Sequence, residues 1–180
     1  RCDGSFLYPV PLNQRSPDDT LLRGAVPQPP EEAGTDPYGA WIARCGRAGI
    51  NVVRPWLMPG FLGLEWRRDW HGYHGLGHYN LRNAWRIDRL LELGRAHDVL
   101  IELALWQHGP WVLPGEADSQ WVDNPYNQAL GGPLRVPSRA LEDPTVRRLH
   151  RQMARYAAAR WGADPHLFGW TLWIEVDAVT

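Results

Sequence analysis

The stretch LFGWTLWIEVD, residues 167 to 177, decides the fold of this sequence. It is a short apolar and aromatic run that ends in a carboxylate, Glu175, and such runs are typical of buried β-strands. Side chains alternate along a strand, so Thr171, Trp173 and Glu175 share one face. The other face holds four bulky side chains that we expect to pack under helices: Phe168, Trp170, Leu172 and Ile174.

An acid at the end of such a strand lies where α/β barrels place their active sites. Glu175 is therefore a candidate catalytic residue. The alternative is that Glu175 is an ordinary solvated acid, because most surface carboxylates have no chemical role.

Outward from this stretch, predicted strands and helices alternate along the chain. Four apolar runs predict strands, at residues 5–10, 50–57, 99–106 and 167–177. Helical spacing of apolar residues predicts helices at 38–48 and 83–97, and a third helix from the N-cap Asp143 to about residue 161. Residues 12–37 are rich in Pro, Gly, Asp and Asn and are predicted to form a loop.

This order predicts an α/β fold with a parallel sheet and right-handed crossovers. The connections from helix to strand are short, whereas those from strand to helix are long and aromatic, which favours a (β/α)8 TIM barrel. We expect residues 1–180 to form a single partial barrel domain that contains only the first four strands. A doubly wound sheet is the alternative, but no Gly-rich phosphate motif follows the first strand.

Composition narrows the function. The chain has 180 residues, a formal net charge of -1 and 11 tryptophans, with 18 glycines and 16 prolines. This balance gives no reason to expect a nucleic-acid or membrane partner, whereas abundant tryptophan in ordered loops suits stacking on sugars. We expect a carbohydrate partner and no cofactor, and no pattern fixes an oligomeric state.

The start of the chain has neither an initiator Met nor a signal-peptide core, so we expect a mature product or a fragment. Two cysteines are too few to fix a redox compartment, and Cys45 is expected to be a buried thiol. The cellular location stays open, with a secreted or extracytoplasmic protein as one option.

Three of the predicted strands each have one face that carries both polar and apolar side chains. These mixed faces predict a common site. They carry Arg54 and Trp56, then Glu102, Trp106 and His108, and finally Trp173 and Glu175. Tryptophan can stack on a sugar ring, arginine and histidine can donate to hydroxyls, and a partly desolvated glutamate can hold a proton. Each residue also has a structural interpretation: Arg54 can simply neutralise Glu102, His108 can be a loop residue, and the tryptophans can belong to the core.

These residues lead to a family resemblance. From about Phe6 to Asp177 the chain resembles the N-terminal half of clan A glycoside hydrolases, most closely the cellulase-like enzymes of glycoside hydrolase family 5. The matching stretches are AGINVVRPWL, NAWRIDRLLELGRAHDVLIELALWQH, the NPYN loop and ARYAAARWGADPHLFGWTLWIEVD.

The resemblance implies roles for individual residues. It assigns Glu175 as the catalytic acid/base and Arg54 as a substrate-binding arginine, and it matches His108 to a histidine after strand three. Trp106 and Trp173 join them as expected substrate-binding residues. The chain departs from the family at Ile174, where the family has an asparagine that binds the sugar hydroxyl beside the reacting carbon.

The implied function is hydrolysis of O-glycosidic bonds in a β-linked polysaccharide or oligosaccharide. A retaining glycosidase needs two carboxylates roughly 5 Å apart, and the family's nucleophile falls beyond Thr180. We therefore expect an incomplete catalytic domain. The alternative is a non-catalytic carbohydrate-binding protein or a degenerate homologue.

Three histidines, His71, His74 and His78, lie close together in a glycine-rich stretch. Such spacing can bind a metal, but structural sites usually have ligands on regular elements. We interpret these residues as a solvated loop and expect no metal.

Overall fold

One parallel sheet organises the chain. The computed structural model describes residues 4–16 and 36–180. Its sheet contains four strands in sequential order, all parallel: β1 (Pro11–Asn13), β2 (Val52–Arg54), β3 (Leu100–Gln107) and β4 (Leu167–Ile174). Sequential parallel pairing is the arrangement of a (β/α)8 barrel, so the structure confirms the predicted fold class.

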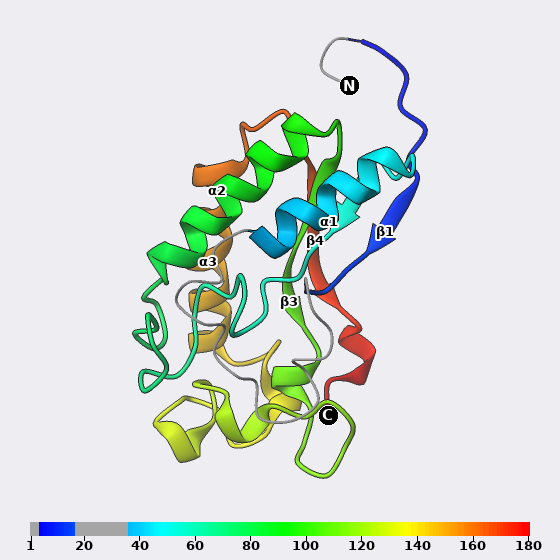
Figure 1. The fold of residues 1–180 in the computed structure, drawn as a ribbon. Helices are drawn as coiled ribbons and strands as arrows, with labels where there is room; N and C mark the ends of the chain where they lie inside the picture. Colours follow the sequence, from blue (N-terminus) through cyan, green and yellow to red (C-terminus); the bar gives the residue numbers. More distant parts are fainter. Residues whose placement is uncertain (1–3, 17–35) are drawn as a thin grey trace.

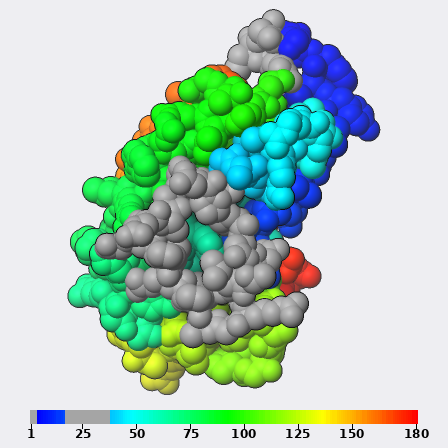
Figure 2. Space-filling view, viewed as in Figure 1, coloured from blue at the N-terminus to red at the C-terminus, as the bar shows by residue number. Residues whose placement is uncertain are grey.

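The helices lie on one face of this sheet (Figure 1). They are α1 (Asp36–Arg47), α2 (Leu81–Ala96) and α3 (Pro144–Trp161), and one precedes each of the last three strands. In Figure 2, α1 and α2 form a continuous surface on the side that faces the viewer. The loops that follow β2 and β3 lie toward the lower end of Figure 1, where a barrel fold builds its site.

The core lies between the sheet and these helices. Val53, Ile101 and Leu103 point from the strands into this layer, and each is fully buried. Ile87 and Leu90 from α2 meet them. Burial of each such aliphatic side chain contributes roughly 1.5–3 kcal/mol relative to exposure, so this layer dominates the stability of the fold.

The helix boundaries follow the predictions to within two residues, and the N-caps explain where the helices begin. Asp143 accepts hydrogen bonds from the amides of Thr145 and Val146, at 2.8 and 3.0 Å, as its place before Pro144 predicted. Helix α2 begins earlier than predicted because Asn80 caps it, accepting from the amide of Asn83. Cys45 is buried, as expected.

The predicted first strand is wrong. Residues 5–10 form no strand, and pairing with β2 begins only at Pro11. The side chain of Asn51 takes the place of a strand neighbour here: its amide donates to the carbonyl of Tyr8 and accepts from the amide of Val10. Most of the predicted loop over residues 12–37 lies outside the described residues.

The outer face of β4 also differs from the prediction. Ile174 and Trp170 pack into or against the main core, whereas Phe168 and Leu172 are 45% and 63% exposed. Among the described residues, no helix covers these two side chains.

No described helix is long and apolar enough to cross a membrane.

We predict that Asp143→Ala lowers the free energy of unfolding by about 1 kcal/mol, because it removes the acceptor for two amides of the first turn of α3. Urea unfolding measures the change. Asp143→Asn should retain most of the stability, and the exposed Glu116→Ala is the control. Equal stability of Asp143→Ala and Glu116→Ala would contradict this role for the cap.

Candidate active site

Arg54 and Glu102 face each other across the sheet, on the side away from the helix core. The guanidinium Nη1 of Arg54 lies 3.9 Å from Oε1 of Glu102. The same carboxylate oxygen accepts a hydrogen bond from the hydroxyl of Thr171. Residues of β2, β3 and β4 are thus joined on the predicted mixed face. The expectation that Arg54 neutralises Glu102 agrees with this geometry.

Asn13, at the end of β1, extends this network. Its side-chain oxygen accepts hydrogen bonds from Nε of Arg54 at 3.2 Å and from Nε1 of Trp56 at 2.9 Å. These two hydrogen bonds fix the orientations of the Arg54 and Trp56 side chains relative to the sheet. Sequence reasoning missed Asn13 because it placed the first strand too early.

His108 and Glu175 meet at the C-terminal ends of β3 and β4. Nδ1 of His108 lies 3.0 Å from Oε2 of Glu175, without the alignment of a directed hydrogen bond. The imidazole also meets the Trp56 ring edge-on, with centroids 6.4 Å apart. A continuous series of contacts therefore runs from Arg54 through Asn13, Trp56 and His108 to Glu175.

The backbone of Glu175 is strained. Its φ and ψ are 53° and 49°, the left-handed region that non-glycine residues rarely adopt. This conformation ends β4 and turns the side chain, which is 57% exposed, toward His108. Strain of this kind costs on the order of 1 kcal/mol.

Trp106 and Trp173 occupy different surroundings. Both rings lie against His150 of α3, with centroids 4.5 and 5.7 Å from the imidazole. Trp111 and Tyr126 complete this aromatic cluster, each 5.5 Å from His150. The contacts shown are those of packing, and a sugar-stacking role for either tryptophan stays a prediction.

Ile174 is 6% exposed and belongs to the main core. It faces the side of the sheet opposite to the Arg54–Glu102 pair. An asparagine at this position would bury its amide among apolar side chains, at a cost in free energy.

No metal centre is evident. Among residues 4–16 and 36–180, no group of three His, Cys, Asp or Glu side chains is placed to hold a metal ion. The loop between β2 and α2 contains His71, His74 and His78, and all three are exposed.

Comparison with known proteins identifies the fold. The sequence matches no protein-family model, and no curated protein is significantly similar to it. The structure is similar to a GH5_18 protein from Bifidobacterium longum subsp. longum ATCC 55813 in complex with Manb1-4GlcNAc, with a TM-score of 0.52 and 14% identity. That match covers 78% of this chain and 28% of the solved one.

The structure is also similar to the AHE enzyme from Alicyclobacillus herbarius, with a TM-score of 0.51 and 15% identity. That match covers 93% of this chain and 35% of the solved one. The chain therefore shares part of its fold with these two solved proteins. It represents half of the (β/α)8 barrel and spans much less than two thirds of either solved chain.

We predict a pH dependence from the aromatic cluster. Burial lowers the pKa of His150 from 6.5 to about 4, and its Nε2 has no hydrogen-bond partner among the described residues. Between pH 6.5 and pH 4, His150 binds more protons in the unfolded chain than in the folded one. The stabilisation that depends on a neutral His150 is therefore fully present above pH 6.5 and is lost as the pH falls toward 4. From pH 7.5 to pH 5 this loss is about 2 kcal/mol.

The measurement is urea unfolding of the protein and of His150→Phe at both pH values. His150→Phe should not show the part of the stability loss that titration of His150 causes between pH 7.5 and pH 5. His78→Phe, in the exposed loop, should show the same loss as the unchanged protein. An identical pH dependence in the protein and in His150→Phe would contradict the assignment.

Proposed function

We propose that this chain carries the acid/base half of a glycoside hydrolase site, which acts on O-glycosidic bonds of a β-linked polysaccharide or oligosaccharide. The observation that carries the proposal is the contact between Glu175 and His108. It lies at the C-terminal ends of neighbouring strands, the end of a (β/α)8 fold where catalytic residues sit.

Glu175 is the proton donor in this proposal. Its carboxyl group protonates the departing glycosidic oxygen, and the resulting carboxylate then takes a proton from the attacking water. More than half of the side chain is exposed, so a substrate can reach it. His108 is a positioning residue, because its Nδ1 lies beside one carboxylate oxygen and leaves the other to face the substrate.

Arg54 is the proposed substrate-binding residue. Asn13 and Glu102 fix the orientation of its guanidinium, while a third of the side chain stays exposed. An arginine held in this way can donate charge-assisted hydrogen bonds to sugar hydroxyls with little loss of side-chain entropy. The Manb1-4GlcNAc bound by the similar GH5_18 protein suggests β-1,4-linked mannose oligosaccharides as first probes, and the resemblance to cellulase-like enzymes suggests β-1,4-linked glucose oligosaccharides.

The mechanism requires a second carboxylate roughly 5 Å from the first. Among the described residues, Glu102 is an acid on this face, but it already accepts from Thr171 and faces Arg54. We infer, as the resemblance to family 5 implies, that the nucleophile comes from outside the described residues.

A non-catalytic carbohydrate-binding protein is the second candidate. The burial of Ile174 favours it, because the position matched to the family's hydroxyl-binding asparagine is part of the core. Such a protein would still bind sugar through Arg54, but mutation of Glu175 would have no effect on any turnover.

We predict saturable binding of β-1,4-linked manno- or cello-tetraose to the purified chain, measured by isothermal titration calorimetry. Arg54→Ala should weaken binding roughly tenfold or more, since a hydrogen bond to a charged group contributes about 1.5–3 kcal/mol. Arg44→Ala, an exposed change on α1, is the matched control. Absence of binding to every β-linked tetraose would overturn the sugar site.

The same preparation tests catalysis. With a single available carboxylate, hydrolysis of an activated aryl β-glycoside should not exceed that of Glu175→Gln. Turnover well above this variant would show that the chain contains a complete site. In a protein that supplies the second carboxylate, Glu175→Gln should lower kcat by about 10²–10⁴-fold, and an unchanged kcat would favour the non-catalytic candidate.

A further inference from the structure

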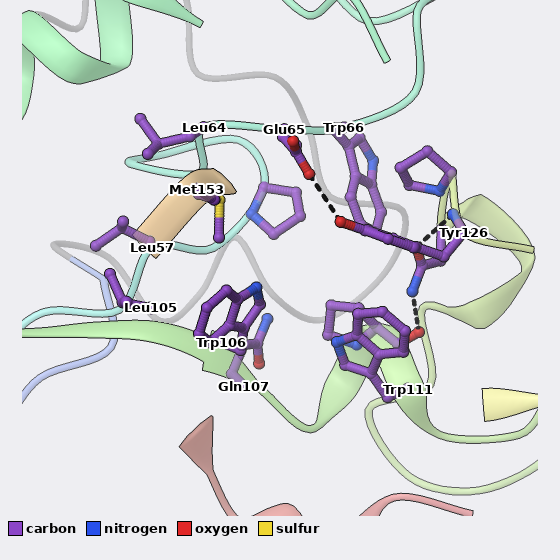
Figure 3. A pocket seen from close by; sticks show the side chains of 14 residues that line it. Leu57, Leu64, Glu65, Trp66, Leu105, Trp106, Gln107, Trp111, Tyr126 and Met153 are labelled. Atoms are coloured by element: carbon purple, nitrogen blue, oxygen red, sulfur yellow. Dashed lines mark hydrogen bonds between the residues drawn. The ribbon is translucent and has the colours of Figure 1, made fainter. Parts of the chain in front are cut away.

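A cavity of about 50 Å³ lies behind the C-terminal end of β3, on the helix side of the sheet (Figure 3). Its walls come from β3, α3 and the two long loops that follow β2 and β3. Most of them are apolar or aromatic: Leu57, Trp66, Leu105, Trp106, Trp111 and Met153. A pocket with such walls and a few polar groups is the usual form of a small-molecule site.

The polar end of the cavity is Glu65. Its Oε1 accepts from the amide of Gly77 at 2.8 Å, and its Oε2 accepts from the hydroxyl of Tyr126 at 3.0 Å. Figure 3 shows Glu65 and Tyr126 reaching toward each other across the cavity. Each carboxylate oxygen can accept a further hydrogen bond, because it carries two lone pairs.

Two buried donors of the lining have no partner. Gln107 and Trp66 are only 6% and 4% exposed, and neither Nε2 of Gln107 nor Nε1 of Trp66 has a hydrogen-bond partner among the described residues. Buried N–H groups are nearly always paired in folded proteins, because an unpaired one is costly. An occupant of the cavity with an acceptor oxygen would satisfy them.

We propose that this cavity binds a small neutral molecule of the alcohol or polyol class. A hydroxyl oxygen can accept from the Gln107 and Trp66 donors, and a hydroxyl hydrogen can be donated to Glu65, while the carbon atoms meet the aromatic walls. At about 10–15 Å³ for each water-sized group, the cavity has room for about four heavy atoms.

An organic cation fits the same walls less well. Aromatic rings beside a carboxylate can hold an ammonium group, but a cation offers no acceptor to the unpaired N–H groups of Gln107 and Trp66. Burial also raises the pKa of Glu65 to about 7, so near neutral pH the carboxyl is often protonated. A hydroxyl can bond to either form, whereas a cation needs the ionised one.

The cavity is next to the candidate active site but on the opposite side of the sheet. Gln107 directly precedes His108, and it pairs with Ile174, which directly precedes Glu175. A ligand in the cavity would therefore lie against the helix-facing side of the C-terminal ends of β3 and β4. The proposal does not depend on glycosidase activity, since Glu65, Trp66 and Gln107 have no role in the proposed glycosidase site.

Titration with ethylene glycol, which has four heavy atoms, tests the proposal. The indole N–H of Trp66 and the side-chain amide of Gln107 should shift saturably in ¹H–¹⁵N correlation spectra, with a dissociation constant in the millimolar range and similar values at pH 6 and pH 8. Met153→Phe fills the cavity and should abolish the shift of the Trp66 signal. Gln107→Leu should weaken binding at least fivefold, and Arg155→Leu on the exposed face of α3 should leave it unchanged.

Several results would overturn the proposal. Shifts that grow linearly without saturation, or that persist in Met153→Phe, would show a solvent effect rather than a site. Saturable binding of tetramethylammonium that strengthens from pH 6 to pH 8, without binding of ethylene glycol, would identify a cation site instead. If Met153→Phe does not fold, the comparison of Gln107→Leu with Arg155→Leu gives the same decision.

Discussion

The register between β3 and β4 is the constraint on which the candidate site depends. Trp106 lies opposite Trp173 and Gln107 opposite Ile174, so the residues that follow, His108 and Glu175, come within 3.0 Å of each other. A shift of one residue would exchange the two faces of the strand. The carboxylate would then point into the helix layer, and the polar contacts between the strands would be lost.

This register separates two environments that lie back to back. On one face, polar side chains from all four strands form a connected network around Arg54 and Glu102. On the other, the core side chains of β3 and β4 pack against the helices, and a small cavity beside Glu65 lies behind the end of β3. Rigid packing behind the strand ends suits a catalytic site, since residues on regular elements keep their geometry better than residues on loops.

Periodicity predicted the parts of this structure that local sequence determines. The three helices, the four parallel strands and the positions of Glu175 and Arg54 on the mixed face follow from apolar spacing and caps such as Asp143. The rest depends on distant partners. The first strand was misplaced because a side chain, Asn51, binds residues 8–10. Glu65 gave no signal in its glycine-rich loop, because its burial arises from Gly77 and Tyr126, which only the fold brings near.

The central claim is that Arg54, His108 and Glu175 form one sugar site on the face of the sheet that is turned away from the helices. The most direct test is to map the nuclear magnetic resonance signals that change when a β-1,4-linked tetraose is added to the labelled chain. The account predicts saturable shifts of the Arg54 Nε–H, the His108 ring and the Glu175 amide, with the signals of the α2 surface around Trp85 unchanged. Shifts centred on that outer surface, with Arg54 and His108 unperturbed, would contradict it.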